Sequence, residues 1–455
     1  MKSIQLAYQA VRTSDAPMTG DSLGYDPAGP TRSSRRDVVP READARAAWT
    51  HALALQATVY GTPAVLQYAQ MHDQVLRPGA PGRMGAFTHQ RTLAGPDFQA
   101  FRAPNVDTLY SNAWVHVGAE PVELGLPDFG GRYYTVQVVD AYSNSLNISA
   151  RTVGTAVRRV WLVSSGWHGH APAGVEVLRV ATPVIWLLLR IQVLGGDVAE
   201  VHALQDRMSL LGGGLAVDGA TAGGDVEHDW RAFFRALDAV LRLNGFPRDE
   251  WALVRQFAGL GLLGASSWAA ESLDDATAEA MAGGFRTAQE ILRSSRAQLG
   301  VPTGTGWTRV LDKGAHGHNF LARAVMNHVG LGANVAEENT SFNTYVDGTG
   351  RALTGGDGPY VVEFADPPPQ AAFWSVTLYH ADTGRLVTNS LGRHALGSAA
   401  LGDERPVRIV LDRTDPGEDN WLPCPDGEFF LVLRIYRPGH PVVTGTWLPA
   451  PVRAR

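Results

Sequence analysis

The sequence predicts a β-rich α+β protein in which two β-sandwich or jelly-roll-like modules flank a helical segment. Two observations favour this fold class. Gly and Pro contribute 50 and 27 of the 455 residues, without a collagen period, which is typical of a turn-rich β protein. Strand-like alternation fills residues 101–194 and returns after about 342, whereas helical periodicity dominates residues 197–330.

We therefore divide the chain into four parts. They are an irregular arm at 1–43, N-terminal helices with the first β module at 44–195, a helical segment at 196–330 and a second β module at 331–455. The arm is polar and aperiodic, so we expect it to bury little surface. After it, a helix should run to Tyr60, stop at Gly61-Thr62-Pro63 and be followed by a second helix from Pro63 to Leu76.

The clearest strand lies after the Gly130-Gly131 turn, where residues 132–144 alternate between two faces. Shorter strands are expected at 160–163 and 175–180. In the middle segment, two sets of apolar residues recur at helical spacing. They are Trp230, Phe233, Phe234, Leu237, Val240 and Leu241, and then Ala278, Met281, Phe285, Ala288 and Leu292.

Two strand segments resemble each other. Residues 134–140 begin with an aromatic side chain and alternate to Asp140, and residues 374–380 do the same and end in His380. Duplication of one β module would explain the likeness. Chance is the alternative, because amphipathic strands share one pattern.

Composition excludes several classes of protein. The net charge of −6 argues against a nucleic-acid or anionic-membrane binder, and the single cysteine, Cys424, excludes an internal disulfide framework. No apolar stretch of a secretory signal occurs in residues 1–43, and the run from Val184 to Leu194 carries Arg190 and is too short to span a bilayer. We expect a cytoplasmic protein with a small-molecule substrate; homo-oligomerisation stays open.

The segment Asn105-Val-Asp107-Thr-Leu-Tyr110 is the first candidate site. In extended backbone Asn105 and Asp107 share a face, and a carboxylate, an amide and a phenol together could orient and deprotonate a small substrate. The alternative is an Asx-turn, in which the Asn and Asp side chains bond to local backbone and only shape a loop.

The end of the 132–144 strand is the second candidate. There an apolar face gives way to Asp140, Tyr142 and Asn144, as at the mouth of a barrel or sandwich that binds a ligand. Burial of Asp140 would raise its pKa and make it a general base. The alternative is an ordinary exposed strand end.

We expect no cofactor. The pairs His168/His170 and His316/His318 could share a strand face as metal ligands do, but neither has an obvious third ligand in the sequence. The glycine-rich stretches lack the lysine of a phosphate-binding loop, and no Gly-x-Ser-x-Gly nucleophile elbow is present.

Several motifs resemble a family with two paired regions, the domain of unknown function 1254 followed by the domain of unknown function 1214. The first is similar to residues 102–110, 131–142 and 151–155, and the second to residues 330–334, 373–379, 420–423 and 445–449. The resemblance implies β-sandwich modules joined by helices and no defined reaction. It also implies an N-terminal signal in many envelope or secreted relatives, which residues 1–43 lack, and an aspartate where this chain has His380.

These observations favour a cofactor-independent enzyme for specialised metabolism that acts on a small polar organic substrate by elimination, cyclisation, isomerisation or hydrolysis. We expect Asp107, Asp140 and His380 to converge on one pocket, with Asp107 or Asp140 as base and His380 or Tyr110 as acid. The residues expected to bind or orient the substrate are Asn105, Tyr142, Asn144, Arg151, Trp374 and Arg393. The alternatives are a non-catalytic carbohydrate- or ligand-binding protein with Trp374 and Trp421 as platforms, and a metalloenzyme.

Overall fold

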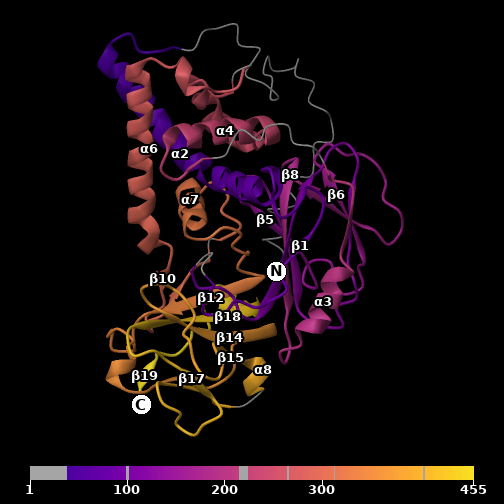
Figure 1. The fold of residues 1–455 in the computed structure, drawn as a ribbon, viewed down its shortest axis with the longest axis vertical. Helices are drawn as coiled ribbons and strands as arrows, with labels where there is room; N and C mark the ends of the chain where they lie inside the picture. The colour runs from indigo at the N-terminus through magenta and orange to yellow at the C-terminus, as the bar shows by residue number, and fades with distance from the viewer. Residues whose placement is uncertain (1–37, 99–101, 215–223, 264–265, 312, 403–404) are drawn as a thin grey trace.

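The fold is known from a computed structural model that describes residues 38–98, 102–214, 224–263, 266–311, 313–402 and 405–455. Nearly all of the predicted N-terminal arm lies outside these residues, so its expected lack of burial stays a prediction. The described chain forms two β modules and a helical unit (Figure 1). The predicted β-rich α+β class is confirmed.

The first module consists of two sheets that share one apolar core. Its larger sheet has the order β1 (Thr88–His89), β2 (Thr108–His116), β8 (Val184–Gln192), β4 (Tyr134–Val139) and β5 (Ser145–Ser149). The smaller sheet has the order β7 (Glu176–Val180), β6 (Arg159–Ser164), β3 (Val122–Gly125) and β9 (Ser209–Leu211). Side chains such as Val136 and Leu162 meet between them. Helix α3 (Val198–Asp206) packs on the same core, so this module extends past the predicted limit at 195.

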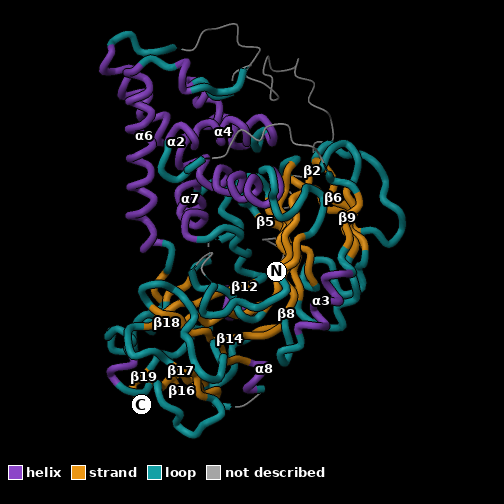
Figure 2. Tube along the Cα trace, viewed as in Figure 1, coloured by secondary structure: helices purple, strands orange, loops and turns teal. Residues whose placement is uncertain are grey.

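The second module repeats the two-sheet plan. Its larger sheet has the order β10 (Val301–Pro302), β11 (Thr308–Arg309), β12 (Asn339–Thr344), β18 (Phe429–Pro438), β14 (Gln370–His380) and β15 (Ala395–Gly397). The smaller has β17 (Trp421–Pro423), β16 (Val407–Asp412), β13 (Tyr360–Phe364) and β19 (Arg453–Ala454). The short helix α8 (Ser398–Leu401) lies at its edge (Figure 2), and α9 (His440–Thr444) follows β18.

The helical unit covers the upper part of the first module's larger sheet (Figure 1). It contains α2 (Ala43–Met71), α4 (Trp230–Asn244), the short α5 (Trp251–Val254), α6 (Asp275–Ser295) and α7 (Phe320–Val329). Both predicted apolar stripes face inward, on α4 and α6. The outer face of the sheet contributes Trp114, Trp186 and Leu188 to this core. Among the described residues no helix is long and apolar enough to cross a membrane.

The predicted break at Pro63 is wrong, because α2 continues through it and leads directly into a π-helical turn, His72–Leu76. Pro63 cannot donate a backbone hydrogen bond, but the segment around it is fully buried, and packing against α4, α6 and α7 holds the helix together. Gly61 permits the closest approach, since a Cβ there would lie 2.8 Å from Leu237 Cδ1 of α4. Tertiary contacts therefore override the local stop signal.

The larger sheets of the two modules turn their outer faces toward each other. On β14 the side chains of Trp374, Val376 and Leu378 point into the second module's core, and Ser375, Thr377 and Tyr379 point outward. On β4 Val136 and Val138 point inward, and Thr135 and Gln137 point outward. The two segments that resemble each other in sequence thus use equivalent faces; duplication itself stays a hypothesis.

Candidate functional site

Charged and phenolic side chains gather between these two outer faces, in what we call the inter-module layer. They are Asp107, Tyr110, Tyr133, Arg190, Lys313, Glu338, Tyr379, Arg434 and Tyr436. These residues lie at the start of β2, immediately before β4 and β12, on β8, β14 and β18, and in the loop before α7. Strand alternation explains the arrangement, since Arg434 and Tyr436 point away from the second module's core, which Leu433 and Ile435 fill.

Asp107 is the carboxylate of the layer that lies nearest to the pocket described below. Its Oδ2 accepts hydrogen bonds from Ser375 Oγ at 2.7 Å and from Tyr436 OH at 3.2 Å. Burial raises the pKa of Asp107 above its ordinary value, although these hydrogen bonds and the charge of Arg434 oppose the increase. A carboxyl with a raised pKa in such surroundings is a stronger base than an ordinary aspartate.

Within the described residues, two arginines of the layer form hydrogen bonds only with neutral groups. Arg434 donates to Tyr379 OH at 2.9 Å, to the carbonyl of Ala103 at 2.9 Å and to Thr377 Oγ1 at 3.3 Å. Arg190 donates to Gln137 Oε1 and the carbonyl of Gly332, and its guanidinium lies 5.1 Å from the centre of the Tyr110 ring.

Lys313 is the third cation. It is 7% exposed, and its Nζ lies 3.4 Å from Asn339 Oδ1, a long hydrogen bond. Burial, together with the positive charges of Arg434 and Arg190, lowers the pKa of Lys313 to about 7. A substantial fraction of this amine is therefore neutral near pH 7, in the form that can accept a proton.

Glu338 belongs to the layer but is already paired. Its side chain is fully buried, and Oε2 accepts hydrogen bonds from Arg151 Nε at 2.9 Å and from Ser149 Oγ at 3.0 Å. Burial, and then the charge of Glu338, raises the pKa of Tyr133 well above its ordinary value. Arg151, predicted to orient a substrate, thus lies at the layer as the partner of Glu338.

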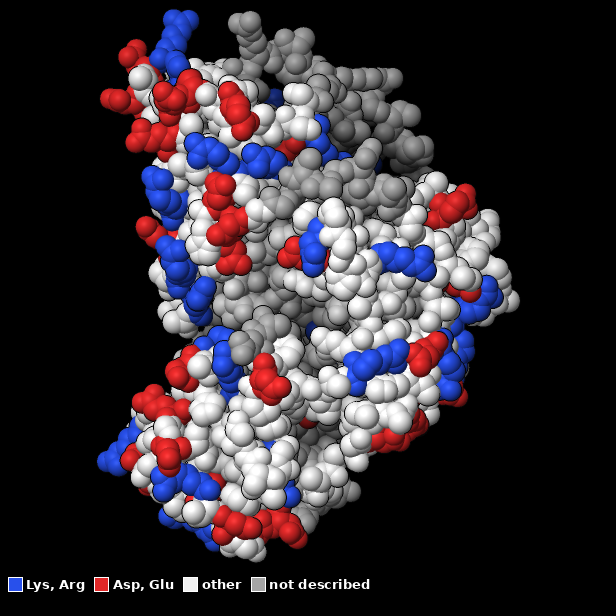
Figure 3. Space-filling model, in the orientation of Figure 1, with Lys and Arg blue, Asp and Glu red and all other residues white. Residues whose placement is uncertain are grey.

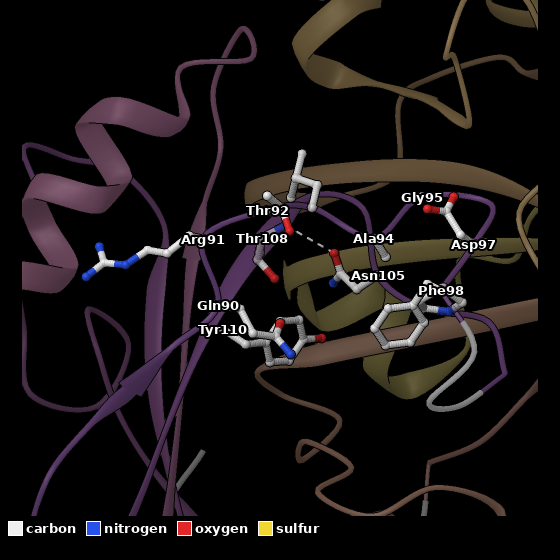
Figure 4. Close-up of a pocket in the computed structure, with 12 residues that line it drawn as sticks. Gln90, Arg91, Thr92, Ala94, Gly95, Asp97, Phe98, Asn105, Thr108 and Tyr110 are labelled. Atoms are coloured by element: carbon white, nitrogen blue, oxygen red, sulfur yellow. Dashed lines mark hydrogen bonds between the residues drawn. The ribbon is translucent and has the colours of Figure 1, made fainter. Parts of the chain in front are cut away.

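A cavity of about 340 Å³ opens beside the layer (Figure 4). Asn105, Thr108 and Tyr110 line it on one side, and the segment from Gln90 to Phe98 lines it on the other. Asn105, Tyr110 and Phe98 point into a common space, whereas Arg91 points away toward α3, where it pairs with Asp206 (Figure 4). The hydroxyl of Thr108 is buried and has no hydrogen-bond partner among the described residues.

The cavity and the layer are one side chain apart. Asn105 Nδ2 donates to Tyr436 OH, which in turn donates to Asp107. The ring of Tyr110 separates the cavity from Arg190. A second cavity, of about 140 Å³, is lined by Tyr133, so cavities border the layer at two places.

Asn105 also forms the Asx-turn that was the alternative interpretation of this segment. Its Oδ1 accepts the backbone N–H groups of Asp107 at 2.6 Å and Thr108 at 3.1 Å. The turn fixes the start of β2 and holds the Asn105 amide at the cavity. The structure therefore brings the predicted residues Asn105, Asp107 and Tyr110 together, in a turn and at a pocket.

Asp140, Tyr142 and Asn144 lie at the other end of the sheet, under the helical unit. Asp107 precedes β2 opposite Val193, whereas Asp140 follows Val139, which pairs with Trp186. At about 3.3 Å per residue, the two carboxylates are roughly 20 Å or more apart along the strands. The Asp140 carboxylate caps a tight turn by accepting the N–H groups of Tyr142 at 2.9 Å and Asn144 at 2.8 Å. Burial does raise the pKa of Asp140, as expected, but at a turn and not at the pocket.

His380 does not reach the layer either, so the predicted convergence of the three residues is wrong. It lies five residues beyond Ser375 on β14, on the opposite face and about 16 Å further along the strand. Trp374 is 1% exposed in the second module's core. Arg393 Nη1 donates hydrogen bonds to the carbonyls of Asp419 and Trp421, both at 2.9 Å, and so has a structural role at that position.

Neither His-Gly-His pair forms a metal site in the structure. His168 and His170 are exposed, and His318 Nε2 lies 2.9 Å from Asp249 Oδ2 in an exposed ion pair. In the described parts of the chain, no group of three His, Cys, Asp or Glu residues could hold a metal ion.

Sequence reasoning missed Lys313, Arg190 and Arg434, although each carries a local signal. Lys313 is one of only two lysines in the chain. Arg190 is the single charge of β8, and Arg434 interrupts the apolar part of β18; a charge in such a strand needs a specific reason.

Comparison with protein families identifies this two-module architecture. The protein of unknown function family DUF1254 matches residues 84–211, and the family DUF1214 matches residues 338–440. The chain therefore belongs to the proteins that pair these two regions, in the order expected from its motifs. The first match ends with β9 and the second begins at Glu338, so each covers much of one β module.

The fold recurs in solved structures. The VPA0106 protein from Vibrio parahaemolyticus is 21% identical, with a TM-score of 0.71 over 89% of this chain and 100% of that one, which shows a shared fold. An uncharacterized protein from Burkholderia cenocepacia is 13% identical, with a TM-score of 0.41 over 92% of this chain and 90% of that one, too low to support a conclusion. A comparison with curated proteins finds no match.

Proposed function

We propose that this protein is an enzyme that acts on a small polar organic substrate by general acid–base chemistry at the cavity beside the inter-module layer. The observation that carries the proposal is the hydrogen-bonded path from the cavity through Asn105 and Tyr436 to the Asp107 carboxylate. Asp107 would accept a proton through the Tyr436 hydroxyl, which Asn105 holds in place, and so assist an elimination, cyclisation, isomerisation or hydrolysis without a cofactor. The enzyme would act in the cytoplasm, in keeping with a single free cysteine, Cys424.

Each residue would have a distinct role. Asp107 would accept the substrate proton through Tyr436, and its raised pKa suits a base. Tyr110, at the cavity wall beside Arg190, would donate a proton or a hydrogen bond to the group that gains negative charge. Asn105 would orient the substrate with the amide that already bridges cavity and layer.

Burial weakens the case for the rival carbohydrate-binding function. A sugar-stacking platform needs an exposed aromatic face, but Trp374 is 1% exposed and Trp421 is 8% exposed. The indole N–H of Trp421 is also bonded, to the carbonyl of Asp412. The enzyme proposal therefore has the better support.

Asp107→Asn is expected to abolish turnover and to leave the fold intact, because the amide keeps the shape of the carboxylate and removes its basicity. Purified protein would be incubated with a low-molecular-weight cell extract, and mass spectrometry would follow compounds consumed by the wild type. In the wild type, the rate should fall on the acid side at a pH above the ordinary aspartate range, since the base has a raised pKa.

The matched control is Asp366→Asn, which removes an exposed carboxylate paired with Arg405 on the second module. This variant should consume the same compounds at the wild-type rate. Turnover that persists in Asp107→Asn, with the same melting temperature, would show that Asp107 is not the base.

A further inference from the structure

The charges of the inter-module layer do not balance. The layer contains three cations, Arg190, Lys313 and Arg434. Of its two carboxylates, Glu338 is paired with Arg151, so only Asp107 is left to balance these cations. Within the described part of the chain, no carboxylate lies within ion-pair distance of any of these three cations. Buried cations normally have a counter-ion, since taking a charge out of water is costly. Positive charge is therefore left over in the layer.

Among the residues that the structure places, these cations have only neutral hydrogen-bond partners. They are two phenol or hydroxyl oxygens, two backbone carbonyls and two side-chain amides, from Tyr379, Thr377, Ala103, Gly332, Gln137 and Asn339. Such dipoles orient and hold a cation but do not cancel its charge. An anion placed among the three would be attracted by all of them in a medium of low dielectric constant.

We propose that the inter-module layer binds an organic oxyanion, a carboxylate or phosphate head group, between Lys313, Arg190 and Arg434. Guanidinium groups bind carboxylate and phosphate oxygens through paired N–H donors, and an ammonium group adds a compact charge. The rest of the ligand would occupy the 340 Å³ cavity, where the unpartnered hydroxyl of Thr108 offers a further hydrogen bond. The inference rests on the proposed function for its location and names the substrate class of that enzyme.

The ring of Tyr110 marks the route from the cavity to the cations. It lines the cavity, and its centre lies 5.1 Å from the Arg190 guanidinium. Pro104 lines the same cavity, and its carbonyl accepts a hydrogen bond from Tyr379, which itself accepts one from Arg434. Tyr110 and Pro104 thus connect the cavity wall to Arg190 and, through Tyr379, to Arg434.

Calorimetric titration with malonate and with phosphate would test the proposal, with sodium chloride at equal ionic strength and neutral malonamide as reference titrants. At least one oxyanion should bind the wild type. Near pH 8 binding should take up a proton, because the anion raises the pKa of Lys313 from about 7; the same titration in buffers of different ionisation enthalpy measures that proton.

Lys313→Met should weaken this binding at least tenfold and remove the proton uptake. The matched control is Arg405→Met, which deletes an exposed cation paired with Asp366 and should bind like the wild type. Arg190→Met is a second variant of the layer and should also lose affinity at least tenfold. Binding of malonate alone or of phosphate alone supports the proposal and identifies the head group.

Two results would overturn it: no binding above the chloride reference, or unchanged affinity in both Lys313→Met and Arg190→Met. The acid–base proposal can fail separately. Oxyanion binding together with full turnover by Asp107→Asn would leave the anion site standing and remove Asp107 as base. Lost turnover in Asp107→Asn without oxyanion binding to the wild type would support Asp107 as base and reject the anion site.

Discussion

Arg323→Met is expected to lower the free energy of unfolding by about 3–5 kcal/mol, the cost of breaking a buried ion pair. Arg323 is fully buried in α7, and its Nη1 lies 3.1 Å from Oε1 of the buried Glu250. The variant would leave the Glu250 carboxylate buried without its cation, with the hydrogen bond from Tyr60 at 2.7 Å still in place. The guanidinium also lies 4.9 Å from the centre of the Phe320 ring, a contact that methionine replaces only in part.

Urea unfolding measures this loss. The double variant Arg323→Met/Glu250→Gln should recover part of the stability, because the glutamine removes the charge left without a partner. Arg405→Met, in an exposed pair with Asp366, should unfold like the wild type. A change as small in Arg323→Met as in Arg405→Met would show that the ion pair does not hold the helical unit together.

Lys313→Met is expected to stabilise the protein, by an amount on the order of 5 kcal/mol or less near pH 7. The folded protein lowers the pKa of Lys313 from 10.5 to about 7, so between these values the folded state binds fewer protons than the unfolded state. Stability from this group is therefore present above pH 10.5 and is lost as the pH falls to about 7. Methionine has no charge to desolvate and a similar length.

Chemical denaturation at pH 7, 8.5 and 10 measures the gain. We expect the difference between variant and wild type to shrink by about 1.4 kcal/mol per pH unit as the pH rises through this range. Arg405→Met should show no such trend. A variant that is less stable than the wild type at pH 7 would mean that the Lys313 amine is well solvated or paired in the folded state.

A substitution that removes a charge and stabilises the protein, as we expect for Lys313→Met, is characteristic of a functional residue. Binding sites keep charges at a cost in stability, which a ligand later offsets. The contrast between Arg323 and Lys313 separates two kinds of buried cation in one chain. Arg323 is paired with the Glu250 carboxylate and stabilises the helical unit. Lys313 has no carboxylate partner among the described residues, and we propose that a ligand supplies the negative charge.

The fold class was predictable because its signals are local. Alternation at residues 132–144 and the apolar stripes of α4 and α6 need no knowledge of distant contacts. The error at Pro63 arose where local chemistry and tertiary packing disagree. Burial of α2 against three other helices outweighs one missing hydrogen bond, and nothing in the neighbouring residues reports that burial.

The candidate site was predictable only where its residues are neighbours in sequence. Asn105, Asp107 and Tyr110 share one segment; the structure places Asn105 and Tyr110 in the cavity wall and Asp107 behind it, joined to Asn105 through Tyr436. Arg190 of β8 and Arg434 of β18 are more than two hundred residues apart, and they share one layer only because the two modules pack outer face to outer face. The prediction for His380 was wrong because side chains alternate between the two faces of β14. The apolar face that ends at His380 is the inner face of the second module, whereas the site residues lie on its outer face.

Nuclear magnetic resonance of protein labelled at lysine would test the charge of the inter-module layer most directly, because the chain contains only Lys2 and Lys313. The Lys313→Met variant assigns the two side-chain signals. In the free protein the Lys313 signal should titrate with a midpoint near 7, and the midpoint should rise when malonate or phosphate is added. A Lys313 signal that titrates near 10.5 and does not respond to either anion would contradict a buried cationic layer built to receive one.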